Sequence, residues 1–504
     1  MLPFKSFLAA FVSTSTMRHV AKLPMLQRVT TSASAFDVDE RMLRKFGAKK
    51  STAISIDRSG LFQIEPHSHD IAQTKEPETP MVKHLRALIQ FRGGPITVAE
   101  YMSEVLTNPT AGYYTQRNVF GSAGDFITSP EVSQLFGEMV GIWCVWMWQE
   151  LGRPRQLRLV ELGPGRGTLM ADLLRSTAAF PDFARSVSVE LVEVSDALKE
   201  RQMSSLGCST SAAEASADSS TFHSSLSGAE VRWHRSLDDV RGESPALYIA
   251  HEFFDALPVH HFQRTSRGWR ERLVDASQDP TDPLHLRLVL APNETPASKL
   301  LLPPRLAGLT PADRDSLDLL EVCPQGLGLA GELAKRVTAE GGAALVIDYG
   351  HDQPYADSLQ AIKDHSFVPV LSQPGLADLS AHVDFSAIKH SVNTAEGSNA
   401  SCHGPITQAH FLEALGIRER LEGLLQTASQ EEGEQLISGY YRLVSSSSDD
   451  ADSQRETAQP GEADAIRGED GSDPLTQAAR EEGMGITYKV LAITPQSSSS
   501  PIPF

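Results

Sequence analysis

The sequence predicts an α/β fold in which helices cover a doubly wound, mostly parallel β-sheet. Four short apolar runs have the length and composition of strands that are buried on both faces. Helix-like patterns separate several of these runs, and strands that alternate with helices form parallel sheets. The first run also leads directly into a glycine-rich turn. The runs are QLRLVEL (156–162), SVSVELVEV (186–194), PALYIAH (245–251) and GGAALVIDY (341–349).

The size and composition fit a large globular chain. The protein has 504 residues, of which 40% are hydrophobic. That length suits two or three domains, or one large α/β domain with insertions. No stretch approaches the roughly 20 consecutive apolar residues that a membrane-spanning helix needs. The richest apolar segment, IWCVWMWQEL from Ile142, contains Glu150 and is interpreted as a buried helix of the core.

The formal net charge of −19 argues against a nucleic-acid-binding protein, which would need a basic face. The stretch 445–482 contributes much of this charge, because it holds eleven acidic and three basic residues, a net of −8. The rest of the chain is therefore only mildly acidic.

Cysteine and histidine spacings do not predict a metal site. The four cysteines are scattered without a CxxC pair, which fits neither a zinc site nor a disulfide framework and suggests a reducing compartment. Two histidine pairs lack further ligands at suitable spacing. We expect no metal. The cysteines are Cys144, Cys208, Cys323 and Cys402, and the histidine pairs are His67/His69 and His260/His261.

The N-terminus has the composition of a mitochondrial transit peptide. Residues 1–36 contain Lys5, Arg18, Lys22 and Arg28, many Ser and Thr, and no acid before Asp37. A disordered basic N-terminus is the alternative. Residues 37–80 show little sustained period and are interpreted as a flexible extension.

Helical patterns begin after this extension. In PMVKHLRALIQFRGG apolar residues recur at helical spacing until Gly93-Gly94. In ITVAEYMSEVL, Thr97 is a plausible N-cap, with Glu100 at the capping-box position. We therefore expect an N-terminal helical region over 81–155, an α/β domain over 156–494 and a tail over 495–504. Three low-complexity stretches, at about 204–230, 392–404 and 445–483, are expected to be disordered insertions.

The turn in LVELGPGRGTLM (159–170) is a candidate ligand site. Gly163, Gly165 and Gly167 allow positive φ and a close approach of a ligand to the backbone. The spacing GxGxG is not the dinucleotide GxGxxG, and no lysine follows as in a phosphate loop. Phosphate is therefore not the obvious ligand. The alternative is a tight strand-to-helix turn without a ligand.

Two acidic residues favour a cofactor. Preceded by Glu161, the pattern ExGxGxG resembles the S-adenosylmethionine loop of class I methyltransferases. An acid is useful there because that cofactor carries an ammonium and a sulfonium group. Glu193, near the end of the next apolar run, can accept both ribose hydroxyls of a nucleoside.

A second pair of carboxylates follows the run PALYIAH. Glu252 and Asp255 lie in EFFDALP, at the same sheet edge as the glycine turn if the strand order is suitable. Carboxylates form bidentate, charge-assisted hydrogen bonds with a guanidinium group, so this pair could position an arginine acceptor. The structural alternative is that Glu252 caps a helix and Asp255 pairs with a surface base.

Two further polar clusters have both structural and functional interpretations. GSAGDFITSPEVSQLFGE contains Asp125 and Ser129 and predicts a loop with a helix that begins near Pro130. On these residues alone a helix cap is favoured over a lid above a cofactor. Asp348 and Tyr349 end the run LVIDY, where a turn and a contact with a ligand site are equally compatible.

Taken together, these segments resemble the MidA-like methyltransferases over about Met81 to Thr494. Many sequence segments occur in the same order as in that family, and such a series is more specific than a single glycine-rich loop. The resemblance is carried by GPITVAEYMSEVLTNPTAGYY, GDFITSPEVSQLFGE, VELGPGRGTLMADLL, LVEVSDALKERQ, AHEFFDALPVHHF, EVCP, GGAALVIDYGH, PGLADLSAHVDFSAI, GPITQAHFLEALGI and MGITYKVLAIT.

The resemblance implies a class I S-adenosylmethionine-dependent methyltransferase fold with an added helical substrate-side region. It implies symmetric dimethylation of an arginine on the iron–sulfur protein 2 core subunit of respiratory complex I, in the mitochondrial matrix. Carried onto this chain, Gly163, Gly165, Gly167 and Glu193 bind the donor, with Asp125 from a lid, and Glu252 and Asp255 face the acceptor. Ser129 and Asp384 are weaker acceptor-side candidates. Two other hypotheses remain, a non-catalytic assembly chaperone and a small-molecule methyltransferase.

Overall fold

The computed structural model describes residues 76–116, 128–209, 222–279, 282–355, 357–364, 366–445 and 483–504. The expected transit peptide, Asp125 and the acidic stretch 446–482 lie outside these ranges. Within the described ranges, no helix has both the length and the apolar character needed to cross a membrane.

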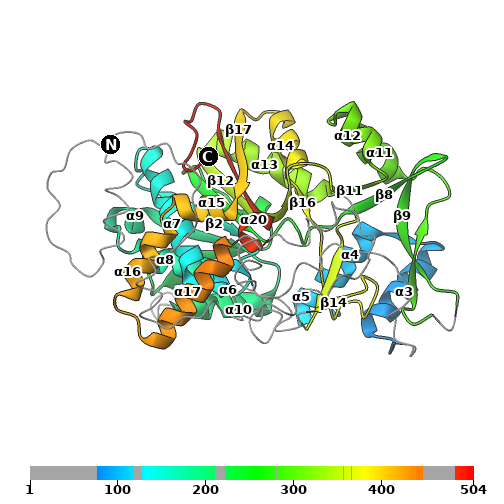
Figure 1. Ribbon diagram of the computed structural model, residues 1–504, viewed down its shortest axis with the longest axis horizontal. Coiled ribbons are helices and arrows are strands. Elements are labelled where there is room, and N and C mark those ends of the chain that lie inside the picture. The colour runs from blue at the N-terminus through cyan, green and yellow to red at the C-terminus, as the bar shows by residue number, and fades with distance from the viewer. Residues whose placement is uncertain are drawn as a thin grey trace, which may run out of the picture.

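A ten-stranded sheet forms the centre of the molecule (Figure 1). Its order is β17-β18-β12-β7-β2-β3-β6-β5-β4, and the short β16 pairs with the end of β12. The strands from β12 to β6 are parallel, whereas β18 is antiparallel to β12. The predicted sheet is confirmed, and all four apolar runs form strands in it. The strands are β2 (Leu157–Leu162), β3 (Val187–Val192), β4 (Cys208–Ser209), β5 (Phe222–Ser224), β6 (Glu230–His234), β7 (Ala246–His251), β12 (Gly342–His351), β16 (Val383–Asp384), β17 (Ala400–Thr407) and β18 (Tyr488–Pro495).

The strand order reverses next to β2. From β2 the chain proceeds outward through β3 and β6, and it then crosses back to β7 on the other side of β2. In open α/β sheets ligands bind outside the carboxyl ends of the strands at such a switch point. The carboxyl ends of β2 and β7 are therefore the position where a ligand is expected.

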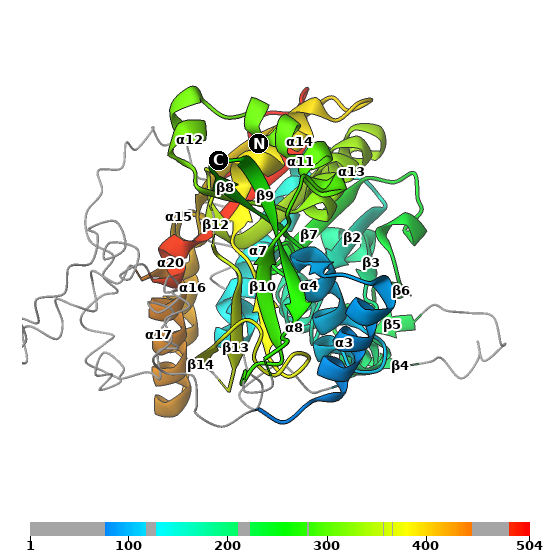
Figure 2. The same cartoon turned by 90° about the vertical axis from the view of Figure 1, so that its right-hand side faces the viewer.

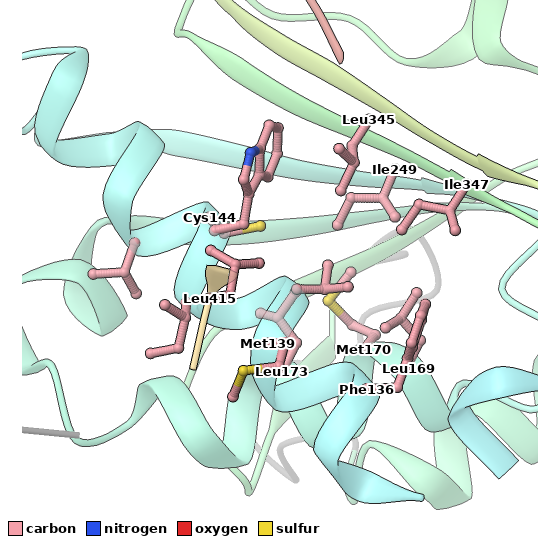
Figure 3. Close-up of a cluster of buried hydrophobic side chains, with 14 of the residues drawn as sticks. Phe136, Met139, Cys144, Leu169, Met170, Leu173, Ile249, Leu345, Ile347 and Leu415 are labelled. Carbon is pink, nitrogen blue, oxygen red and sulfur yellow. The ribbon is translucent and has the colours of Figure 1, made fainter. Parts of the chain in front are cut away.

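Helices cover both faces of the sheet. The helices α7 (Gln134–Glu150) and α8 (Thr168–Thr177) pack on one face, and α13 (Pro324–Glu340) and α14 (Phe385–Thr394) pack on the other. Alternate residues of β2 point to opposite faces, Leu159 to the first core and Val160 to the second. The apolar run from Ile142 lies in α7, and its Trp143 is fully buried, as predicted. Figure 3 shows Phe136, Met139 and Cys144 of α7 and Met170 and Leu173 of α8 beside the strand residues Ile249, Leu345 and Ile347.

Short and C-terminal helices complete these layers. The buried side chains of α15, α16 and α17 join the same core as α7. Between α7 and α16, Arg420 Nε donates to Oε2 of the buried Glu138 over 2.6 Å. The remaining helices of this part are α6 (Ser129–Val132), α9 (Pro181–Ser186), α10 (Asp196–Ser205), η2 (Leu237–Asp239), α15 (Gln408–Ala414), α16 (Ile417–Leu425), α17 (Gln430–Val444) and α20 (Met484–Thr487).

A second, smaller unit of helices and two sheets lies to the right of the central sheet in Figure 1 and faces the viewer in Figure 2. It contains the expected helices α3 (Pro80–Arg92) and α4 (Val98–Thr107), but also a five-stranded and a three-stranded sheet that the sequence did not reveal. By contrast α7, within the expected N-terminal helical region, packs on the central sheet. The other elements are α5 (Tyr113–Gln116), α11 (Pro296–Ala307), α12 (Pro311–Ser316), β1 (Ile96–Thr97), β8 (His260–Thr265), β9 (Gly268–Ala276), β10 (Leu286–Leu290), β11 (Leu319–Val322), β13 (Gln360–Lys363), β14 (Ser366–Val368) and β15 (Asp378–Ser380).

The predicted boundaries of α3 and α4 are confirmed in atomic detail. Gly93 ends α3 with φ of 72°, and its N–H returns to the carbonyl oxygens of Gln90 and Ile89. Thr97 caps α4 by accepting from Glu100 N over 3.0 Å, and Thr97 N donates back to Glu100 Oε2 over 2.9 Å. Local sequence thus determines where both helices begin or end.

Two of the three expected insertions contain regular structure, contrary to the prediction. Within 204–230, β4 and β5 form an antiparallel pair, although residues 210–221 lie outside the described ranges. Within 392–404, β17 pairs with β18. Small polar side chains supply little apolar burial, but backbone hydrogen bonds to a neighbouring strand order these segments instead. The third stretch, 445–483, is described only at Ser445 and Gly483.

Candidate active site

The glycine turn after β2 has the backbone that the sequence predicted. Gly163, Gly165 and Gly167 have φ of 60°, 52° and 80°, values that residues with a Cβ atom rarely adopt. The turn ends where α8 begins at Thr168, and Gly163 N donates to Val192 O of β3 over 3.0 Å. A Cβ atom at Gly163 would lie 2.6 Å from Cδ2 of Phe253. The turn therefore packs directly on the segment that follows β7.

A glutamine that sequence reasoning missed connects the turn to Glu193. The fully buried Gln202 of α10 donates from Nε2 to Gly165 O over 2.8 Å and to Glu193 Oε2 over 3.0 Å. Its Oε1 accepts from Trp233 Nε1 over 2.8 Å. Glu193 also accepts from Ser195 N over 2.8 Å, and burial raises the pKa of its carboxyl above the usual range. No spacing rule would have identified Gln202, because its partners come from three separate segments.

Glu161 is a buried acid next to the turn. Its residue is 3% exposed, and burial raises the pKa of the carboxyl to about 8. Oε2 has no hydrogen-bond partner among the described residues. A buried carboxylate without a partner is costly, so the site favours either a proton or a cation at this position.

The segment after β7 brings a second group of polar residues to the same edge. Glu252 has a φ of 47°, unusual for a non-glycine residue, and its side chain is 5% exposed. Its Oε1 accepts from Ser129 N over 3.4 Å. His251 Nε2 lies 3.5 Å from the same oxygen, but burial lowers the pKa of His251 to about 3. The imidazole is therefore neutral near pH 7, and this contact is not an ion pair.

Asp255 and Asp348 are the other carboxylates of this group. Asp255 is 7% exposed, and Asp348 is fully buried near the carboxyl end of the neighbouring strand β12. Asp348 Oδ2 accepts from Phe254 N over 2.9 Å. Burial, and the negative charges of Asp255 and Glu252, raise the pKa of Asp348 well above its usual range. Three carboxyl groups therefore lie close together beside the glycine turn.

The two weaker candidates have different positions. Ser129 begins α6 as predicted and is fully buried, with Oγ 3.4 Å from Gln408 Oε1. Because its N–H reaches Glu252, Ser129 belongs to the acceptor-side group. Asp384 instead caps α14 by accepting from Ala387 N over 2.9 Å, and it pairs with Arg305. Asp384 therefore has a structural role that is complete without a substrate.

The histidine pair His260/His261 is also used structurally. His260 Nδ1 lies 2.7 Å from Glu271 Oε1, and His261 Nε2 lies 3.1 Å from Glu321 Oε1. Among the residues that the structure describes, no three His, Cys, Asp or Glu side chains form a metal-binding group. His67 and His69 lie outside those residues.

Comparisons with known proteins agree with this geometry. Residues 139–406 match the family described as "Putative S-adenosyl-L-methionine-dependent methyltransferase". The human "Protein arginine methyltransferase NDUFAF7, mitochondrial" is 44% identical over 73% of this chain and 81% of its own length. The chain belongs to this methyltransferase family. The Drosophila melanogaster "Protein arginine methyltransferase NDUFAF7 homolog, mitochondrial" is 41% identical over 80% of this chain and 90% of its own length.

A solved structure gives the same fold. A COG1565 superfamily member from Burkholderia thailandensis, bound to S-adenosyl-homocysteine, has a TM-score of 0.60 and 24% identity, and the match covers 85% of this chain and 97% of that one. Family membership makes this chain an S-adenosylmethionine-dependent methyltransferase and confirms the expected cofactor and class I fold. The relatives are named mitochondrial proteins, which supports mitochondrial localisation.

Proposed function

We propose that this chain transfers methyl groups from S-adenosylmethionine to a guanidine nitrogen of an arginine in a protein substrate. The observation that carries the proposal is the buried group of Glu252, Asp255 and Asp348, which lies beside the glycine turn at the carboxyl ends of adjacent strands. Carboxylates this close repel one another, so the group favours a cation, and arginine is the cation whose planar fork pairs with two carboxylates. The names of the relatives support the same acceptor.

On the donor side, the proposal assigns binding to Gly163, Gly165, Gly167 and Glu193, with Glu161 near the positive groups of the donor. The positive φ values leave the turn without side chains where a nucleoside has to approach the backbone. Gln202 fixes Glu193 relative to that turn, so the carboxylate keeps the position in which it can accept ribose hydroxyls. Asp125, also assigned to this side, lies outside the described residues.

On the acceptor side, Glu252 and Asp255 hold and orient the guanidinium group. The bound donor supplies an electrophilic methyl group on a sulfonium centre. The guanidine nitrogen forms the new C–N bond while the S–C bond breaks, and one proton has to leave the nitrogen. Since His251 is a very weak base with a pKa of about 3, the carboxylates are the groups suited to take that proton.

The finer assignment follows the family resemblance. It is symmetric dimethylation of an arginine on the iron–sulfur protein 2 core subunit of complex I, in the mitochondrial matrix, as a step that assists assembly. The chain would act on this subunit before it is buried in the complex. The second unit adjoins the acceptor-side turn, because its strand β8 starts at His260 and Ala381 N, next to β15, donates to Asp255 O over 2.9 Å. This unit is therefore the part of the chain that we propose contacts a protein substrate.

The test is a methyl-transfer assay with the full chain. The protein is incubated with isotopically labelled donor and the purified subunit, and modified residues are mapped by mass spectrometry. Glu252→Gln and Asp255→Asn should each lower turnover by about 100-fold or more, since each removes a group that orients the acceptor or takes its proton. Both should leave donor binding, measured by calorimetry, within about threefold of the parent chain, because neither group contacts the donor in this proposal.

Glu193→Ala is the matched control, because it should abolish donor binding and turnover together. Normal turnover of Glu252→Gln would remove Glu252 from the acceptor site. Donor binding without methylation of the subunit would favour an assembly chaperone. Methylation of free arginine or another metabolite, with the subunit unmodified, would identify a small-molecule methyltransferase.

A further inference from the structure

Asp348 lies under the acceptor-side turn and binds its backbone. The residue is fully buried near the carboxyl end of β12. Its Oδ2 accepts from the N–H groups of Phe253, Phe254 and Asp255 over 3.1, 2.9 and 3.3 Å. Its Oδ1 accepts from Tyr349 N over 3.0 Å. One carboxylate therefore satisfies three consecutive donors of a segment about 94 residues away in sequence.

The turn that Asp348 binds needs such support. Glu252 has a φ of 47°, a conformation that is costly for a residue with a Cβ atom and persists only where the surroundings impose it. On one side Glu252 N donates to Ile347 O over 2.9 Å, and on the other Asp255 O accepts from Ala381 N over 2.9 Å. Asp348 holds the residues between these two anchors.

The turn also faces both sides of the site. Phe253 packs against Gly163 of the donor turn, where an added Cβ would lie 2.6 Å from the ring. Glu252 and Asp255 are the acceptor-side carboxylates, and Phe254 is 5% exposed in the core. A shift of this backbone would therefore move the acceptor carboxylates relative to the donor turn. Methyl transfer depends on that distance, because the reacting atoms must be held in line.

We propose that Asp348 is a positioning residue, whose carboxylate fixes the turn 252–255 so that Glu252 and Asp255 meet the acceptor at the correct place beside the donor. The inference rests on the proposed function. Asp348 does not itself have to touch either substrate. Three backbone N–H groups converge on its Oδ2, and a buried N–H group that loses its acceptor is costly, so removal of this side chain would release the turn.

The test compares Asp348→Asn and Asp348→Ala with Glu138→Gln. Glu138 is a matched control because it is also a buried acid, 2% exposed, but it pairs with Arg420 on α16, away from the turn. For Asp348→Ala we expect kcat to fall by about 100-fold with donor affinity within about threefold of the parent. For Asp348→Asn we expect about a tenfold fall, since the amide oxygen still accepts from the turn while its NH₂ group opposes Tyr349 N–H.

Glu138→Gln should lower the melting temperature while kcat stays within about twofold of the parent, because it disturbs packing but not the turn. If Asp348→Ala does not fold, the decision rests on Asp348→Asn. A kcat within twofold of the parent for Asp348→Asn, or the same kcat loss in Glu138→Gln, would overturn the inference. A parent chain that binds donor but modifies no arginine would instead refute the proposed function, so the two failures are distinguishable.

Discussion

We predict that Gly163→Ala lowers the stability of the protein and weakens donor binding, because Gly163 packs against Phe253. Gly163 has a φ of 60°, and alanine in that left-handed region costs about 1–2 kcal/mol because its Cβ approaches the following carbonyl oxygen. The new Cβ would also lie 2.6 Å from Phe253 Cδ2, well inside ordinary van der Waals contact. The ring, and the acceptor-side turn that carries it, must therefore move.

The backbone cost and the packing cost add up in the free energy of unfolding. Forcing an extra carbon into a packed position costs about 1–3 kcal/mol, so the free energy of unfolding should fall by about 2–5 kcal/mol in total. If the displaced Phe253 ring disturbs the donor turn, the packing cost also weakens the binding of the donor. A coupling of about 1–3 kcal/mol corresponds to about 5- to 150-fold weaker binding.

The assay is urea unfolding together with calorimetric titration of the donor, on Gly163→Ala and Gly152→Ala. Gly152 is the matched control because its φ is 80° but an added Cβ would meet no atom within 4 Å. Gly152→Ala should lose only the backbone cost of about 1–2 kcal/mol and keep the parent donor affinity. Equal donor affinity in the two variants would refute the role of the Gly163–Phe253 contact in forming the donor site.

Three further predictions concern the donor side and the core. Because burial raises the folded-state pKa of Glu161 from 4.5 to about 8, ionisation opposes folding, and parent stability should fall by up to about 1.4 kcal/mol per pH unit between pH 5 and 8. Urea unfolding of Glu161→Gln should lack that part of the slope. Gln202→Leu should weaken donor binding by about tenfold in calorimetry. The substitution removes the hydrogen bond that holds Glu193 and leaves Trp233 Nε1–H without its acceptor. Arg420→Met should lower the free energy of unfolding by about 3–5 kcal/mol, since it leaves Glu138 buried without its cation, while donor affinity stays unchanged.

The central sheet and the donor turn were predictable from the sequence because their signals are local. A strand buried on both faces is a continuous apolar run, and the turn requires glycine at three alternate positions. The caps at Gly93 and Thr97 are local for the same reason. Each of these predictions depends on residues within about one turn or one strand of each other.

The second unit was not predictable in the same way. Its strands β8 and β9 carry many polar residues, some of which pair across the hairpin, as when Arg272 Nε donates to Gln263 Oε1 over 3.0 Å. His260 likewise pairs with Glu271, eleven residues away. Such strands do not stand out as apolar runs. The same argument applies to β17, whose order comes from backbone pairing with β18.

The acceptor side shows why a list of acids does not define a site. Sequence reasoning identified Glu252 and Asp255 from their place after a strand, and left Asp348 between a turn and a ligand contact. The structure brings all three together because β7 and β12 are neighbours, with His251 opposite Ile347. A third segment then contributes Ser129, 123 residues before Glu252 in sequence. None of these distances is encoded in a motif, since each follows from the order of strands and the crossover that returns the chain to β7.

The residues around Glu252 also determine which groups could take a proton from an arginine. His251 Nε2 lies 3.5 Å from Glu252 Oε1, but the buried ring of His251 has a pKa of about 3, and this Nε2 is without a hydrogen-bond partner among the described residues. A base this weak would have to be charged inside an apolar contact with Phe136, whose ring centre lies 4.8 Å away. A carboxylate in the same group pays no such cost while a guanidinium is bound, because the two opposite charges compensate each other. The carboxylates therefore combine two tasks that many enzymes divide between an acid and a histidine: they hold the cation in place, and they accept the proton that methylation releases.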